Sequence, residues 1–137
     1  MEIKTGKGYG NNQLFITGLT LFTCFLGLEL FFRVYDLYRI FPDVDIVSHI
    51  LSGVTLYVII YWILTKTKAE RKNITTLSFT LLIAFAWEAV EYLEDRIVLN
   101  TPYLVDYFFW DGAVDIITTM LGAVIGMGIL KLLKMNN

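Results

Sequence analysis

Ionisable side chains recur at helical spacing inside stretches that are otherwise apolar. Three such pairs have partners three or four residues apart: Asp45 and His49, Glu88 and Glu91, and Asp111 and Asp115. Residues at these spacings share one face of an α-helix, so each pair directs two polar groups toward the same neighbours. Four residues also separate Glu29 from Arg33, which is the favoured order for an ion pair along a helix.

Carboxylates together with one imidazole form a ligand set typical of a divalent cation. Carboxylate oxygens suit Mg²⁺, Mn²⁺ or Ca²⁺, and a histidine beside them also admits Zn²⁺. We therefore predict a divalent metal ion (Mn, Zn, Mg or Ca) as cofactor. The predicted metal ligands are Asp45, His49, Glu88 and Asp115. Without a cation, neighbouring acids would repel one another or hold protons, unless arginines neutralised them.

Four apolar stretches must position these groups, at about residues 14–35, 46–64, 74–95 and 113–133. Each is close to the roughly 20 residues that a helix needs to cross a bilayer. Backbone groups in hydrocarbon must be satisfied within the segment, and the runs lack the alternation of barrel strands, so we expect helices. Short links favour antiparallel neighbours. The prediction is an all-α polytopic membrane protein: a single integral membrane domain over residues 1–137 that forms an antiparallel bundle of four transmembrane helices.

Composition restricts the partners and ligands further. Charged residues make up only 18% of the chain, against about a quarter in soluble domains. The basic residues do not form the clustered surface that nucleic acid requires, so no nucleic-acid partner is expected. The single cysteine, Cys24, excludes an internal disulfide and a zinc site built from cysteines.

Lysine and arginine placement indicates the orientation of the bundle. Most of the eleven basic residues fall in the N-terminal tail, the second link and the C-terminal tail: Lys4, Lys7, Lys66, Lys68, Arg71, Lys72, Lys131 and Lys134. Basic residues collect on the cytoplasmic side, so both termini are expected in the cytoplasm and the protein in the cytoplasmic membrane. The acids and the histidine then meet in one pocket in the outer half of the bundle, which Glu29 and Arg33 approach from the first span.

An acidic pocket at this depth lies where a lipid headgroup would lie. The first hypothesis is a metal-dependent membrane enzyme, a hydrolase or transferase, that acts on a lipid or lipid-linked substrate of the cell envelope. A bound cation would polarise a phosphoryl or carbonyl oxygen or activate water. Glu91 or Asp111 would then serve as the catalytic general base.

Two other classes of protein fit the same residues. Intramembrane acids also mark cation and proton pathways, although the inner halves of the stretches offer no polar path through a monomer. Alternatively, the acids are held in ion pairs by Arg33, Arg39 and Arg96, in a structural protein without catalytic activity. Gly122 and Gly126 form a small-xxx-small pair, which favours close packing within the bundle over the seam of a homodimer.

The run from Tyr103 to Trp110 is aromatic and nearly uncharged, and it follows the turn signal Asn100-Thr101-Pro102. Trp and Tyr prefer the membrane–water interface. We therefore expect this run to lie in the outer interface, before the fourth span begins.

Several motifs resemble those of a known group of bacterial membrane proteins. Asp45-Ile-Val-Ser-His49 resembles the Asp-x-x-x-His element that opens a span in VanZ-like and YjdF-like proteins. Glu88-Ala-Val-Glu91 resembles their acidic third element. Trp110-Asp111-Gly-Ala-Val-Asp115, followed by Gly122-Ala-Val-Ile-Gly126, resembles their closing element. The resemblance covers about residues 43–128.

The sequence also departs from the VanZ pattern, which usually has Gln where Glu91 stands and Asn where Thr119 stands. The two aspartates of the last span are closer to the YjdF type, whose members are usually longer. The resemblance implies a small polytopic protein of the bacterial membrane. VanZ-like proteins are associated with glycopeptide tolerance at the cell envelope, an association that does not transfer as a reaction.

Overall fold

The computed structural model describes the backbone of residues 11–41, 43–97 and 105–133, and the side chains of these residues except 11, 95, 96 and 105–109. The described residues form helices and no strand: α1 (Asn11–Val34), α2 (Leu37–Ile40), α3 (Val44–Thr65), α4 (Lys72–Ile97) and α5 (Val105–Leu132). Four of the helices are long and apolar enough to cross a membrane. The predicted all-α bundle with four spans is therefore confirmed.

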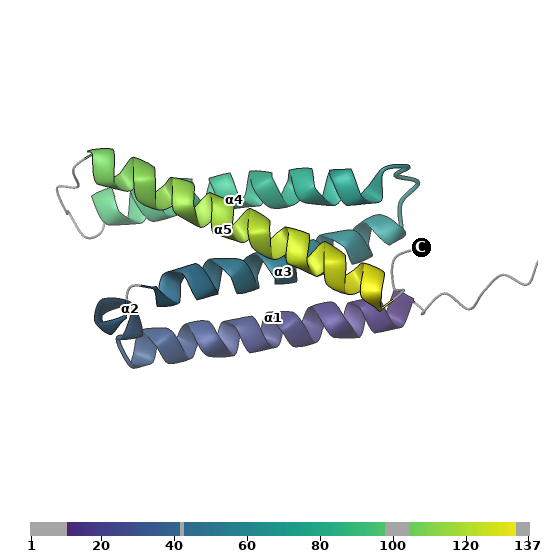
Figure 1. Cartoon of the computed structure of the whole chain (residues 1–137), viewed down its shortest axis with the longest axis horizontal. Coiled ribbons are helices and arrows are strands. Elements are labelled where there is room, and N and C mark those ends of the chain that lie inside the picture. The colour runs from purple at the N-terminus through teal and green to yellow at the C-terminus, as the bar shows by residue number, and fades with distance from the viewer. Residues whose placement is uncertain (1–10, 42, 98–104, 134–137) are drawn as a thin grey trace, which may run out of the picture.

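The four long helices run in alternating directions (Figure 1). At one end of the bundle α1 and α4 finish and α3 and α5 begin; we call it the acidic end. At the opposite end lie the start of α1, the α3–α4 link and the end of α5. We call this the basic end, because the link carries Lys66, Lys68 and Arg71 and α4 begins at Lys72.

Helix α3 is the centre of the bundle. It contacts α1, α4 and α5, and α5 also contacts α4, whereas no Cα atom of α1 comes within 8 Å of one in α4. Half of the most apolar window of α3 is buried inside the protein, against 11% for α1. The remaining apolar surface of α1 therefore faces the surroundings, as expected for a helix in contact with lipid.

Glycines bring α3 and α5 unusually close together. A Cβ atom at Gly53 would collide with the backbone carbonyl of Thr119, and one at Gly122 would collide with the backbone carbonyl of Ile50. A Cβ atom at Gly126 would lie 3.2 Å from the carbonyl oxygen of Val54. The pair Gly122 and Gly126 is thus used for packing within the chain, as the sequence favoured.

The apolar core lies toward the basic end. Its fully or nearly fully buried members come from three helices: Leu14, Tyr57, Val58, Tyr61, Ala123 and Leu130. Buried threonines of α4 satisfy their hydroxyls on the preceding turn, since Thr76 and Thr80 donate to the carbonyls of Lys72 and Thr76 at 2.7 and 3.0 Å. The buried acids and the histidine among the described residues are instead near the acidic end.

Two local features were not predicted. Asp36 adopts a left-handed backbone conformation (φ 53°), which reverses the chain after α1 and starts the short helix α2. Helix α5 begins at Val105, so residues 105–110 already form its first turns. The part of α5 that is long and apolar enough to cross a membrane begins at Trp110, so the position of the aromatic run in the outer interface stays a prediction. Tyr103 and Leu104 lie outside the described residues.

Candidate metal centre

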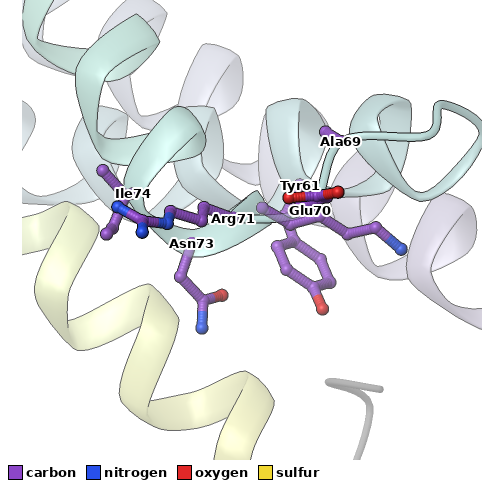
Figure 2. Close-up of a pocket in the computed structure, with 7 residues that line it drawn as sticks. Tyr61, Ala69, Glu70, Arg71, Asn73 and Ile74 are labelled. Atoms are coloured by element: carbon purple, nitrogen blue, oxygen red, sulfur yellow. The ribbon is translucent and has the colours of Figure 1, made fainter.

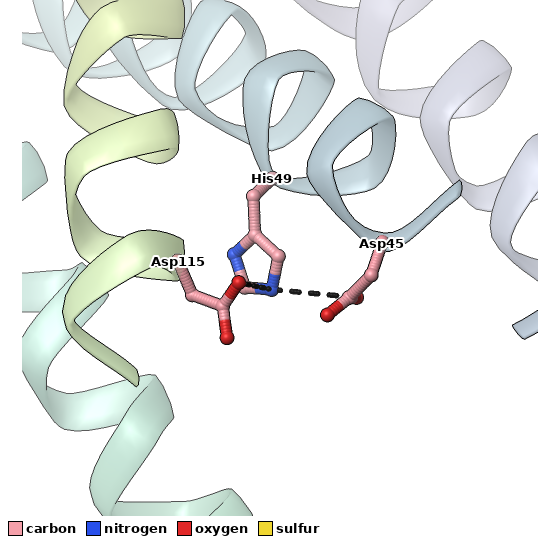
Figure 3. A group of neighbouring side chains, drawn as sticks. All are labelled: Asp45, His49 and Asp115. Atoms are coloured by element: carbon pink, nitrogen blue, oxygen red, sulfur yellow. Dashed lines mark ion pairs between the residues drawn. The ribbon is translucent and has the colours of Figure 1, made fainter. Parts of the chain in front are cut away.

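The imidazole of His49 lies between two carboxylates at the acidic end (Figure 3). Nε2 of His49 is 3.6 Å from Oδ1 of Asp45, one turn earlier on α3, and 3.6 Å from Oδ1 of Asp115 on α5. His49 and Asp115 are buried, and Asp45 is partly exposed. The helical spacing places the first acid, and the close approach of α3 and α5 places the second.

The other ring nitrogen of His49 is held by a hydroxyl group. Nδ1 lies 3.2 Å from Oγ1 of Thr119 on α5. When Nδ1 carries the proton and donates to this hydroxyl, Nε2 presents a lone pair toward Asp45 and Asp115. A hydrogen bond to one ring nitrogen sets the orientation and tautomer in which the other nitrogen can bind a metal.

Helix α4 brings two further acids to the same imidazole. Ligand atoms of His49, Glu88 and Glu91 all lie within 4.8 Å of one another. Glu88 is buried beside the backbone of α5, where a Cβ atom at Gly112 would lie 3.0 Å from its Oε2. Glu91 is partly exposed and shares a side-chain hydrogen bond with Trp87. His49 therefore belongs to two groups of possible metal ligands, one with α5 and one with α4.

A cavity of about 510 Å³ opens beside these groups. Its polar lining includes Glu29, Arg33, Tyr38, Asp45, Ser48, His49, Ser52, Thr55, Glu88, Glu91 and Thr119. The volume is within the range of small-molecule sites. Asp115 is not part of the lining; it is buried on α5, which packs against α3.

Glu29 and Arg33 form the predicted ion pair, with Nε of Arg33 3.0 Å from Oε1 of Glu29. The second oxygen of Glu29 accepts hydrogen bonds from Tyr38 at 2.6 Å and from Ser48 at 2.5 Å. Burial, together with the hydrogen bond to Glu29, raises the pKa of the Tyr38 phenol above its ordinary value. Three donors thus satisfy Glu29, which joins α1 to α2 and α3.

Asp111, the other predicted general base, is exposed at the start of α5 and belongs to neither ligand group. The side chains of Asp95 and Arg96 lie outside the described residues. Thr119, Tyr38 and Trp87 were not predicted as site residues from the sequence. Thr119 is four residues after Asp115, and this helical spacing was the available signal for its place beside His49.

A second cavity, of about 550 Å³, lies at the basic end beside the α3–α4 link. Figure 2 shows that Tyr61 and Asn73 line it together with Ala69, Glu70, Arg71 and Ile74. Tyr57 donates a hydrogen bond of 2.9 Å to the Asn73 side chain. Neither ligand group extends to this cavity, so the chemistry of interest lies at the acidic end.

The residues around His49 fit a divalent cation. Ligands at bond lengths of 2.0–2.2 Å around tetrahedral zinc stand about 3.4 Å apart, close to the two Nε2–Oδ1 distances of 3.6 Å. Within the part of the chain whose side chains are described, no lysine or arginine pairs with Asp45, Glu88, Glu91 or Asp115. Among the described side chains, these acids therefore form no direct ion pair with an arginine of the kind that a purely structural network would need.

Fold and site together define a helical membrane protein with four spans and a buried His/Asp/Glu cluster at one end of the bundle. Residues 11–136 match a family described as predicted membrane protein (DUF2238), and the chain belongs to this family. No curated protein and no solved structure matches the chain.

Proposed function

We propose that this protein is a divalent-metal-dependent membrane enzyme that acts on a lipid or lipid-linked substrate of the cell envelope. The observation that supports this most strongly is the position of His49 between Asp45 and Asp115, with both Nε2–Oδ1 distances at 3.6 Å. YjdF-like proteins belong to the same family, which is consistent with the motifs of the last span. The same motifs also resemble those of VanZ-like proteins.

The two equal distances favour a cation over a hydrogen bond. A protonated Nε2 would draw at least one carboxylate to about 2.7–2.9 Å, the length of a charge-assisted hydrogen bond. At 3.6 Å neither carboxylate makes a hydrogen bond to the ring. A lone pair and two carboxylate oxygens that face a common point repel one another unless a positive charge lies between them.

Three of the four proposed ligands and the proposed base line the cavity. Asp45, His49, Glu88 and Asp115 are the proposed ligands, and a bound divalent ion would act as a Lewis acid toward a phosphoryl or carbonyl oxygen. Glu91 is partly exposed and lines the cavity, so it can take a proton from a water molecule or substrate hydroxyl. Asp111 lies too far toward the surface to be preferred for this role.

Charge placement supports an outward-facing site. Lys66, Lys68 and Arg71 are exposed at the basic end, and basic links face the cytoplasm. The acidic end would then meet the outer leaflet, where the headgroups of lipids and lipid-linked envelope precursors lie. Both termini would be cytoplasmic.

Metal binding is tested first, on purified protein from which the affinity tag has been removed. Mn²⁺, Zn²⁺, Mg²⁺ or Ca²⁺ should raise the unfolding temperature of the wild type, since an ion at a hundred times its Kd stabilises by about 2.7 kcal/mol. The gain should disappear in His49→Gln and persist in Glu70→Gln, a control at an exposed acid of the basic end. No gain with any of these ions would refute the metal site.

Catalysis is tested separately on the metal-loaded protein. Incubation with a bacterial lipid extract, followed by lipid mass spectrometry, should reveal a product that depends on the metal. Glu91→Gln should abolish this product while the protein retains metal. If the loaded wild type converts no lipid in the extract, the enzyme assignment fails even though the metal site stands.

A further inference from the structure

The cavity at the acidic end lies between α1 and α4, whose Cα atoms stay more than 8 Å apart. Its walls are α1, with Phe22, Phe25 and Leu26, and α4, with Ile83 and Trp87, and its floor is α3. Because no Cα atom of α1 lies within 8 Å of α4, the described residues leave this side of the bundle without a covering helix. In a membrane, that side faces the hydrocarbon of the bilayer.

The cavity has a polar end and an apolar end. Along α3 its lining runs from Asp45, through Ser48, His49 and Ser52, to Leu56 and Ile59. At 1.5 Å rise per residue this stretch is about 21 Å long. One leaflet accounts for roughly half of a hydrocarbon core of about 30 Å, so the cleft follows the full depth of one leaflet.

We infer that this cleft admits one hydrocarbon chain of a phosphate-headed lipid sideways from the membrane, with the phosphate at the acidic end beside His49 and Arg33. The inference rests on the proposed function for the metal that would meet the headgroup. The apolar part of the cleft supports the position of the hydrocarbon chain, and Arg33 supports the position of the phosphate.

Arg33 is suited to the phosphate because its guanidinium retains unused donors. It lines the cavity, its side chain is largely exposed, and the ion pair with Glu29 uses Nε. Guanidinium presents five N–H donors in a planar fork that matches phosphate oxygens. The terminal amino groups can therefore contact a headgroup while Nε stays bonded to Glu29.

The guanidinium of Arg33 at one end of the cleft and the apolar lining at the other favour a phosphate-headed lipid over a helix from a second copy. A hydrocarbon chain is as apolar as the surrounding lipid, so the chain alone gains little by entering. The polar head must therefore supply most of the selectivity.

The position of the lipid's hydrocarbon chain is tested by photo-crosslinking of the full-length protein in vesicles. The vesicles contain phosphatidylcholine and phosphatidylglycerol, with a trace of phosphatidylglycerol that carries a diazirine in mid-chain. Labelling should concentrate on the apolar cleft residues: Phe22, Leu26, Ile59 and Ile83. Leu26→Trp should remove most of this labelling, whereas Leu28→Trp, two positions away on the opposite face of α1, should not. Leu26 and Leu28 are both exposed, so the two substitutions place similar demands on folding.

A second blocking variant checks that the loss of labelling is not caused by misfolding of Leu26→Trp. Ile83→Trp lies on the opposite wall, and Leu82→Trp is its exposed control outside the cleft. Labelling spread evenly over all lipid-facing positions and unchanged by the blocking variants would overturn the inference. Labelling replaced by crosslinks between two protein copies at the cleft would overturn it as well.

The position of the lipid phosphate is tested by substituting two arginines, one in the cleft and one outside it. Arg33→Gln should lower the labelling by the phosphatidylglycerol probe at least several-fold, and Arg39→Gln, whose arginine is exposed and pairs with Asp36 outside the cleft, should not. Equal labelling in both variants would refute the role of Arg33. Metal binding is measured on the same samples. Cleft labelling without metal binding would refute the proposed function alone, and metal binding without cleft labelling would refute the lipid cleft alone.

Discussion

The imidazole of His49 on α3 faces the carboxylate of Asp115 on α5, with Nε2 3.6 Å from Oδ1. Helical spacing within one segment cannot produce this contact. It depends on how closely the two helices approach, which the glycines between them control. Gly53 lies against the backbone of Thr119, and Gly122 lies against the backbone of Ile50. The proposed metal centre and the α3–α5 packing are therefore one structural unit.

Gly122→Ala should separate α3 from α5 and weaken the proposed metal site. Its Cβ atom would collide with backbone atoms of Ile50, which cannot rotate away as a side chain would. Overpacking of this kind costs about 1–3 kcal/mol. Thermal unfolding should show the lower stability, and titration with Zn²⁺ should show weaker binding.

Gly128→Ala is the matched control on the same helix. A Cβ atom at Gly128 meets nothing within 4 Å, and alanine is about 1 kcal/mol more favourable than glycine inside a helix. We expect unchanged or slightly higher stability and unchanged metal binding. Equal destabilisation by both substitutions would show that the close approach at Gly122 is not the cause.

Glu88→Gln should have opposite effects with and without metal. In the metal-free protein it removes a buried carboxylate that lies near Glu91 and His49, so the neighbouring acids repel one another less and the unfolding temperature should rise. With metal present, the variant should gain less stability than the wild type. Differential scanning calorimetry at matched ion concentrations measures both effects. A fall in metal-free stability would indicate that Glu88 is held by favourable contacts and not by a bound cation.

The sequence predicted the number and approximate positions of the spans because long apolar runs have few alternatives in a membrane. It also predicted the pair Asp45 and His49, since helical spacing alone brings them together. Thr119 and Gly112 could not be assigned to the site in the same way. Their contacts with His49 and Glu88 depend on how α5 is rotated against α3 and α4, and a single sequence does not encode that rotation in any local pattern.

Tyr38→Phe should reduce the loss of stability at alkaline pH. The pKa of the Tyr38 phenol is raised in the folded protein by burial and by the hydrogen bond to Glu29. Because the folded protein favours the neutral phenol, the raised pKa stabilises the fold at pH values below about 10, the pKa of tyrosine in the unfolded chain. This contribution is lost as the pH rises from there through the pKa of Tyr38 in the folded protein.

The free energy of unfolding of the wild type and of Tyr38→Phe is measured from about pH 8 to about pH 11, a range that includes the pKa of free tyrosine at about 10. The wild type should lose stability more steeply at the upper end, and the variant should be less stable than the wild type at neutral pH. Tyr35→Phe is the control, since Tyr35 is exposed on the same turn. Parallel pH curves for wild type and Tyr38→Phe would contradict the role of this phenol.

The protein should not conduct cations or protons. Toward the basic end, the buried core of α1, α3 and α5 consists of Leu14, Tyr57, Val58, Tyr61, Ala123 and Leu130, which gives an ion no path of carboxylates across the bundle. Proteoliposomes with a pH-sensitive or Mn²⁺-sensitive dye inside should show the same leak as empty vesicles. Flux that requires the protein and disappears in Glu88→Gln would favour a transporter over an enzyme.

The ligands of a bound zinc ion test the central claim most directly, because the chain contains one histidine. X-ray absorption spectroscopy of the tag-free, zinc-loaded protein should show one imidazole nitrogen together with carboxylate oxygens. The imidazole signal should vanish in His49→Gln and remain in Glu70→Gln. If the protein binds none of Zn²⁺, Mn²⁺, Mg²⁺ and Ca²⁺, or if its zinc shows no imidazole ligand, His49 and its neighbouring acids are not a metal centre.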